Sequence, residues 1–266
     1  MLTALKQHWP EYLMEAAELA IFMISACLFS IFLYHPDSPA VSAIPDEFTR
    51  RILMGLAMGL TLVAIVFSPW GQQSGAHMNP AFTLTFLRLG KVAPWDAVFY
   101  VIAQFLGGMA GVGIVAAFAG ISLAHPAVNY APTLPGQAGS GAAFLAEVFI
   151  SFILIVVVLA VLNTPRLSRF TAWFAGACVA AFIVWESPFS GMSMNPARTL
   201  GSAVLPGIWT ALWVYFFAPP LGMLAAAAAY QRLGRHVACA KYHHQNCRRC
   251  IFCEYQAAKT AVQKTM

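Results

Sequence analysis

The sequence predicts an all-α membrane protein, with six transmembrane helices and two re-entrant half-helices arranged as an inverted 3+3 repeat. Three observations predict this fold class. First, 60% of the 266 residues are hydrophobic and only 9% are charged, and the apolar residues form long blocks. Second, the two halves of the chain resemble each other. Third, each half contains one copy of the sequence Met-Asn-Pro-Ala.

Six apolar blocks approach the ~20 residues that a helix needs to cross the hydrocarbon core of a bilayer, although the fifth is short. These blocks are Leu13–Tyr34, Ile52–Trp70, Trp95–Ala119, Ala142–Leu162, Phe170–Trp185 and Ile208–Tyr230. No small-residue cleavage site follows a short apolar core near the N-terminus. We therefore expect the first block to remain in the mature protein as a span.

The distribution of Lys and Arg predicts the orientation. With six crossings, Lys6, Arg88, Lys91, Arg166, Arg169 and the basic residues of the tail all fall on one side. The positive-inside rule then places both termini in the cytoplasm, in a multi-pass protein of the cell (inner or plasma) membrane. The net charge of +5 does not require a nucleic-acid partner, because these basic residues lie in loops and in the tail.

The repeat is visible at the start of each half. "AELAIFMISACLF" begins the first span and "AEVFISFILIVVV" the fourth, which places Glu18 and Glu147 at matching positions. With three spans in each half, the second half must enter the membrane inverted relative to the first. Inverted repeats are typical of transporters and channels, whose functional site lies at the repeat interface near the midplane of the membrane.

The repeated motif is a helix-start signal. "GAHMNPAFTLT", from Gly75, and "GMSMNPARTLG", from Gly191, agree at seven of eleven positions. Asn is a favoured N-cap residue and Pro a favoured first helical residue. Helices are therefore expected from Asn79 to near Gly90 and from Asn195 to about Leu205. About ten residues span ~15 Å, half of the hydrocarbon thickness, so the two half-helices enter from opposite faces and meet at mid-membrane.

Such a helix start is tolerated inside a bilayer only where protein buries it or where it lines a water-filled cavity. The positive dipole ends of the two half-helices repel cations, while the Asn79 and Asn195 amides can donate hydrogen bonds to a neutral molecule. We expect the non-helical backbone before each cap to supply a row of carbonyl acceptors. These carbonyls belong to Gly75, Ala76, His77, Gly191, Met192 and Ser193.

The segments "SGAHMNPA" and "MNPARTLGSA", the paired Glu openings, and the "GG" and "PP" spacing of the third and sixth spans resemble the major intrinsic protein family. This family comprises the aquaporins and glycerol facilitators, and the aquaporin-like channels are the closest. The resemblance covers about residues 11–231. It implies a passive channel and not an enzyme, with no cofactor for transport, one pore per subunit and a homotetramer in the lipid bilayer.

The resemblance also implies a division of the chain. A cytoplasmic N-terminal segment covers residues 1–12, and a channel domain covers residues 13–231, with repeat one at about 13–119 and repeat two at about 142–231. A basic, Cys/His-rich cytoplasmic tail covers residues 232–266. The permeating molecules would be water and small neutral solutes, with protons and ions excluded.

The resemblance carries two constrictions over to this chain. The central one is formed by the two motifs, Asn79, Pro80, Ala81, Asn195, Pro196 and Ala197. The selectivity filter is formed by Met58, Ile183 (or Val184 if the register slips), Met192 and Arg198. Water channels usually have Phe where this chain has Met58 and His where it has Ile183, and glycerol facilitators have Asp where it has Thr199.

Water is therefore the first expectation for the permeant. The first alternative is a facilitator of neutral solutes of the glycerol, urea or ammonia type. An ion-coupled secondary transporter that uses Glu18 or Glu147 is the alternative from another class. The favoured role of these two carboxylates is to brace the non-helical backbone before each motif, although intramembrane ionisable groups are functional candidates by default.

The tail contains a second candidate site. Its possible ligands are Cys239, Cys247, Cys250, Cys253, His243 and His244. Thiols on the cytoplasmic side stay reduced, which argues against a disulfide framework. This set can form a tetrahedral zinc site or hold part of an iron–sulfur cluster. The spacing is not that of a standard zinc finger, however, and the favoured interpretation is a solvated basic tail that faces lipid headgroups.

Overall fold

The computed structural model describes residues 1–235, 237–244 and 249–265. Within them, six helices are long and apolar enough to cross a membrane. They are α1 (Leu2–Tyr34), α3 (Glu47–Phe67), α6 (Pro94–Ala124), α7 (Gly139–Leu162), α8 (Thr171–Trp185, extended by the 3-10 turn η1 at Ser168–Phe170) and α11 (Leu212–Arg232). The predicted fold class is confirmed, and each predicted span corresponds to one of these helices.

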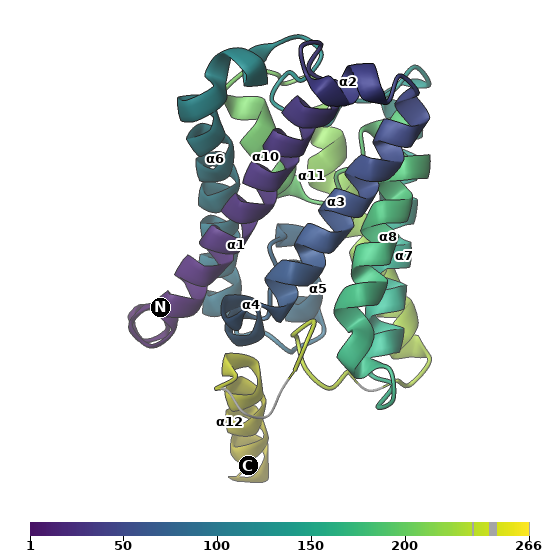
Figure 1. Cartoon of the computed structure of the whole chain (residues 1–266). Helices are drawn as coiled ribbons and strands as arrows, with labels where there is room; N and C mark the ends of the chain where they lie inside the picture. Colours follow the sequence, from purple (N-terminus) through teal and green to yellow (C-terminus); the bar gives the residue numbers. More distant parts are fainter. Residues whose placement is uncertain (236, 245–248, 266) are drawn as a thin grey trace.

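The remaining helices are short or lie in the tail. They are α2 (Pro39–Ala43), α4 (Pro69–Ser74), α5 (Pro80–Arg88), α9 (Ser187–Ser190), α10 (Pro196–Val204) and α12 (Ile251–Thr265). The first residues of α1 and the tail helix α12 lie at the same end of the molecule, which we call the terminal face (Figure 1). Helix α2 lies at the other end, which we call the opposite face (Figure 1).

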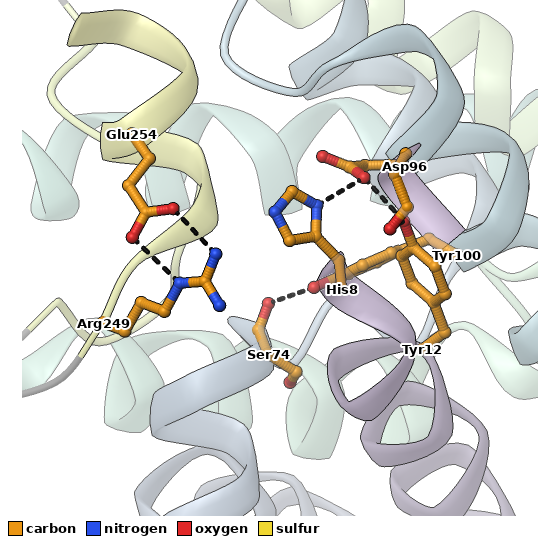
Figure 2. Close-up of polar contacts among 8 residues, drawn as sticks. His8, Tyr12, Ser74, Asp96, Tyr100, Arg249 and Glu254 are labelled. Atoms are coloured by element: carbon orange, nitrogen blue, oxygen red, sulfur yellow. Dashed lines mark hydrogen bonds and ion pairs between the residues drawn. The ribbon is translucent and has the colours of Figure 1, made fainter. Parts of the chain in front are cut away.

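Helix α1 starts well before the first predicted apolar block. Helix α1 begins at Leu2 and passes through Pro10, so most of the segment expected at residues 1–12 forms the first turns of the helix. A buried carboxylate on α6 holds these turns in place. Asp96 Oδ1 accepts a hydrogen bond from the Tyr12 hydroxyl at 2.6 Å and lies 2.8 Å from His8 Nδ1 (Figure 2). Composition alone does not reveal such a long-range contact.

The helices pair as an inverted repeat requires. Helix α1 packs against α6 in the first half, and α7 packs against α11 in the second, while α3 and α8 cross between the halves. Each half-helix packs against the last long helix of the other repeat, α5 against α11 and α10 against α6. The two repeats are therefore interlocked, and neither half-helix is enclosed by its own repeat alone.

Small residues permit the closest helix crossings. A Cβ placed on Gly107 of α6 would lie 2.1 Å from the Ala16 carbonyl oxygen of α1, which shows that the two backbones are in direct contact. The equivalent crossing in the second repeat uses Gly222, where a Cβ would lie 2.2 Å from the Val148 oxygen of α7. Small residues at helix crossings are typical of membrane proteins, where van der Waals contact drives association.

We expect Gly107→Ala to destabilise the protein, because the added methyl group must push α1 and α6 apart. Overpacking of this kind typically costs about 1–3 kcal/mol. The measurement is the thermal unfolding midpoint of the purified protein in detergent. Gly113→Ala on the same helix is the matched control, since its Cβ would meet nothing within 4 Å. Equal midpoints for the two variants would contradict the close crossing.

Candidate functional site

The two half-helices begin at the predicted asparagines. Asn79 caps α5, where its Oδ1 accepts a hydrogen bond from the Ala81 backbone N–H at 2.9 Å. Asn195 caps α10, where its Oδ1 accepts from the Ala197 N–H at 3.0 Å. Each half-helix has nine residues, about 14 Å in length, so neither can cross a bilayer.

The two caps are joined to each other across the repeat interface. The Asn79 side-chain amide donates to the Met194 carbonyl oxygen at 2.7 Å. The Asn195 amide donates to the Met78 carbonyl oxygen, also at 2.7 Å. A carboxamide has two N–H groups, so each asparagine retains one donor that this exchange does not use. The N-termini of the half-helices therefore meet with their polar groups oriented by each other.

The loop before each cap has the same unusual backbone in both repeats. In these two loops, four residues that are not glycine adopt a positive φ: Ala76, Met78, Met192 and Met194. Each such residue typically costs of order 1–3 kcal/mol and persists only where its surroundings hold it. These loops therefore depend on strong external hydrogen bonds.

In the first repeat, that support comes from Glu15 of α1. Its Oε1 accepts from the His77 backbone N–H at 2.8 Å, and its Oε2 accepts from the Met78 N–H at 2.7 Å. Gln104 of α6 donates to the same carboxylate at 2.8 Å. Glu15 is completely buried, so these donors replace the water that the carboxylate has lost.

In the second repeat, Glu147 of α7 gives the loop the same direct support. Its two oxygens accept from the Ser193 N–H at 2.6 Å and the Met194 N–H at 2.7 Å. The same carboxylate accepts from the Ser190 hydroxyl at 2.7 Å. Glu147 therefore has the bracing geometry expected from the sequence.

Glu18 differs from its expected role. It accepts only from the Ser74 hydroxyl, at 2.9 and 3.1 Å, and Ser74 in turn accepts from the Ala76 N–H at 3.0 Å. Glu18 thus acts on the loop through one serine, while direct contact with the backbone belongs to Glu15, one helical turn earlier. Sequence matching paired Glu18 with Glu147 because both follow alanine, but the rotation of α1 places Glu15 against the loop.

Two tyrosines complete the symmetric support, and the sequence reasoning missed both. The Tyr100 hydroxyl of α6 donates to the Ser74 carbonyl at 2.8 Å, and the Tyr215 hydroxyl of α11 donates to the Ser190 carbonyl at 2.6 Å. The positions of Tyr100 and Ser74 beside the first turns of α1 are drawn in Figure 2. The sequence did contain a signal for the two tyrosines, since Tyr100 and Tyr215 follow the motif asparagines by similar distances, 21 and 20 residues.

The site opens into a cavity of about 430 Å³ at the repeat interface. Asn79 and Asn195 line it, and so do all four residues expected in the filter, Met58, Ile183, Met192 and Arg198. Val184 packs instead beside Gly55 of α3, which favours the first of the two registers considered. The cavity runs from Glu47 and Arg51, at the start of α3 near the opposite face, to His77 and Tyr242.

Arg198 is held in the cavity wall by the loop between the repeats. Its Nη1 donates to the Ala131 carbonyl at 2.9 Å and lies 3.3 Å from the Ser202 hydroxyl. A guanidinium has five N–H donors, so this geometry fixes the group and leaves donors for a molecule in the cavity. Of the predicted carbonyl row, His77, Gly191, Met192 and Ser193 line the cavity.

Gly75 and Ala76 do not line that cavity, and the tail covers Gly75. The Gly75 carbonyl accepts a hydrogen bond from the Tyr242 backbone N–H at 3.3 Å. The Tyr242 ring stacks on Phe82 of α5, with centroids 4.6 Å apart, and the residue is only 4% exposed. At the terminal face, therefore, the cavity ends at a residue of the tail.

The structure also brings most of the predicted tail ligands together. The ligand atoms of Cys239, His244, Cys250 and Cys253 all lie within 4.8 Å of one another. The thiols of Cys239 and Cys250 share a hydrogen bond, with their Sγ atoms 3.7 Å apart, and this bond lowers the pKa of Cys250 below its ordinary value. The His243 ring packs against Phe67 instead, with centroids 5.0 Å apart. Cys247 lies outside the described residues.

Re-entrant half-helices at the interface of an inverted repeat define a polytopic membrane protein with its functional site at the centre of the membrane. Residues 4–230 match the sequence profile of the family described as Major intrinsic protein. The chain belongs to that family, whose aquaporins and glycerol facilitators are passive channels and not enzymes, as expected.

Named relatives include both kinds of channel. The chain is 34% identical to Aquaporin A of Dictyostelium discoideum over 192 residues, 71% of this chain and 68% of the relative. It is 41% identical to Aquaporin NIP3-1 of Zea mays over 176 residues, 65% of this chain and 56% of the relative. It is 32% identical to Glycerol uptake facilitator protein-like 6 of Lactiplantibacillus plantarum over 69% of this chain and 85% of the relative.

The matched part of the chain thus spans little more than half of the maize relative and about two thirds of the Dictyostelium relative. Among solved structures, the fold resembles the X-ray structure of the aquaglyceroporin from Plasmodium falciparum. The TM-score is 0.69 at 20% identity, covering 85% of this chain and 97% of that chain. At this identity the likeness shows the fold alone.

We expect Glu147→Gln to loosen the second loop. An amide has only one acceptor atom, so one of the loop N–H groups loses its buried partner, at a typical cost of about 1–3 kcal/mol. The measurement is again the thermal unfolding midpoint in detergent, which should fall. Asp37→Asn is the control, because that carboxylate is 94% exposed. A midpoint for Glu147→Gln as high as that of Asp37→Asn would show that the carboxylate does not support the loop.

Proposed function

We propose that this protein conducts water across the membrane, excludes protons and ions, and also admits small neutral solutes according to the width of its filter. The observation that carries this proposal is the composition of the cavity. Two asparagine amides from the meeting half-helices and one fixed guanidinium line the same cavity as the apolar side chains of Met58 and Ile183. A polar track along an apolar wall suits a small uncharged molecule.

The electrostatics support the exclusion of cations. The N-termini of α5 and α10 both point at the asparagine pair, and each carries the positive end of a helix dipole. Arg198 adds a permanent positive charge at the same cavity. A cation must therefore leave its hydration shell to enter a region of positive potential, whereas a neutral molecule exchanges hydrogen bonds at little cost.

The residues of the filter also support a second candidate function, the passage of small neutral solutes. Met58 is flexible and Ile183 has no hydrogen-bonding group, so Arg198 is the charged member of this four-residue set. A constriction with fewer polar partners binds water less selectively and suits solutes of the glycerol, urea or ammonia type. An ion-coupled transporter is less well supported, because Glu15, Glu18 and Glu147 are occupied by hydrogen bonds to the loops.

We further propose that the terminal face is cytoplasmic, as the positive-inside rule requires, and that residues 13–231 form the channel while residues 232–266 form a separate tail. A homotetramer with one pore per subunit, in the cell membrane, completes the proposal. Light scattering of the purified complex tests this assembly. Permeation itself involves no cofactor. The candidate metal site lies in the tail, where three thiols and an imidazole converge.

The function is tested by stopped-flow light scattering of liposomes that contain the purified chain, first in sucrose and then in glycerol. Tyr242→Ala should be measured alongside, because it removes the ring at the terminal end of the cavity. Fast shrinkage in sucrose indicates water flow, and fast recovery in glycerol indicates the wider, solute-passing filter. If neither protein exceeds empty liposomes, the channel proposal is wrong.

We expect Arg198→Ala, in whichever of these two proteins conducts, to raise glycerol permeability several-fold relative to water and to weaken the exclusion of cations. Loss of the guanidinium removes both bulk and positive charge from the filter. Arg166→Ala is the control, because Arg166 is exposed in a loop outside the cavity. Unchanged selectivity in Arg198→Ala would contradict the filter assignment.

A further inference from the structure

The tail lies directly on the loop of the first motif. The Ala240 carbonyl accepts a hydrogen bond from His77 Nε2 at 2.6 Å, and Lys241 donates from Nζ to the Gln72 carbonyl at 2.7 Å. Phe252, at the start of α12, stacks on the His77 ring with centroids 5.2 Å apart and an interplanar angle of 3°. Together with Tyr242, these residues form what we call the mouth contact.

The mouth contact leaves no room between tail and loop. Gly75 has φ of +100°, and a Cβ there would lie 2.9 Å from the Phe252 ring and 3.1 Å from Lys241 Cγ. Lys241 is 2% exposed although it carries a charge, and Phe252 is 1% exposed. A buried lysine and a buried aromatic ring indicate a formed interface and not a tail that merely lies near the surface.

The four possible ligands alternate with the mouth contact along the chain. Cys239 and His244 flank the segment that contains Ala240, Lys241 and Tyr242. Cys250 and Cys253 flank Ile251 and Phe252. An ion bound by all four would therefore join the two arms of the tail that contact the loop.

Two sulfur–sulfur distances match those around one tetrahedral ion. With Zn–S bonds of ~2.3 Å and Zn–N bonds of ~2.0–2.1 Å, a tetrahedron separates two sulfurs by about 3.8 Å, and a sulfur from a nitrogen by about 3.6 Å. The Sγ atoms of Cys239 and Cys250 are 3.7 Å apart, and those of Cys239 and Cys253 are 3.9 Å apart. Cys253 Sγ lies 3.2 Å from His244 Nε2.

We propose that Cys239, His244, Cys250 and Cys253 bind one zinc ion, and that this ion fastens the tail over the terminal end of the cavity and closes the channel. Zinc removal releases the two arms from each other, and the mouth contact then loses the order that the ion imposed on it. The metal site stands on its own geometry, while the closure rests on the proposed channel function.

The surroundings fit a zinc–thiolate centre. Three thiolates and one neutral imidazole around Zn²⁺ carry a net charge of −1, and the Lys91 and Lys241 ammonium groups interact electrostatically with these thiols. A hollow of about 380 Å³, lined in part by Cys239, His244 and Cys253, gives an ion access. The four protein ligands of an iron–sulfur cluster are divided among two or more iron atoms, so four ligand atoms that all lie this close to one another favour a single ion.

The first experiment measures the metal without reference to transport. The full-length chain, purified and dialysed against zinc, should retain about one zinc ion per chain, and Co²⁺ in its place should show the visible absorption of a tetrahedral thiolate site. Cys250→Ser and Cys253→Ser should each lose most of the zinc and the cobalt spectrum. Cys178→Ser, in span α8, is the control and should retain both.

The metal assignment would be overturned if the unaltered chain retained no zinc, if the serine variants retained as much as the control, or if Cys239 and Cys250 were found joined in a disulfide in the zinc-treated protein. Retention of an iron–sulfur chromophore in place of zinc would overturn it as well. Thermal unfolding midpoints of the variants close to that of Cys178→Ser establish that the spans remain folded.

The second experiment tests closure by stopped-flow shrinkage of the same proteins in liposomes. Zinc should reduce water flow several-fold in the unaltered chain, a chelator should restore it, and Cys253→Ser and Tyr242→Ala should conduct in the presence of zinc. If water flows equally fast in zinc and in chelator, the proposed closure is wrong while the proposed channel function stands. Absence of flow in every protein and condition contradicts the channel function itself, whatever the zinc content.

Discussion

The architecture depends on two buried carboxylates that accept backbone N–H groups inside the membrane. Without Glu15 and Glu147, the loops before the half-helices would present unpaired N–H groups in the interior, which hydrocarbon does not tolerate. Each carboxylate satisfies two consecutive N–H groups in a segment of positive φ. It therefore holds both the strained conformation and the position of the half-helix that follows. The pore geometry is a consequence of this anchoring.

The carboxylates also explain what the sequence did and did not predict. Helix starts are local, so Asn followed by Pro located α5 and α10 to within a residue at their N-termini. The six spans could likewise be predicted from the apolar blocks, because the hydrophobicity of a segment is also a local property of the sequence. The identity of the bracing residue is not local: it depends on the rotation of α1 against a loop about 60 residues later. Glu18 was therefore chosen where Glu15 makes the direct contact.

The tail also shows that long-range contacts cannot be predicted from local sequence patterns. The cysteines and histidines of the tail left both a metal site and a solvated tail open, and the structure brings four side chains of the candidate ligand set together. Spacing did not indicate that the intervening residues would reach back to the first motif. That contact pairs Tyr242 with Gly75, far apart in sequence, through a backbone hydrogen bond that has no sequence signature. The repeat symmetry is broken there, because the second motif has Arg198 and the inter-repeat loop at its entrance, while the first has His77 and the tail.

The exchange of hydrogen bonds between Asn79 and Asn195 has a consequence for assembly. Each asparagine donates to a carbonyl 115 or 117 residues away in the chain. At about 5–20 residues per second, a ribosome needs on the order of ten seconds to make the missing partner. During that interval the first half-helix lacks both its cap partner and α11, the helix that encloses it. The hydrogen bonds between the two motifs can therefore form only after the second motif has been synthesised.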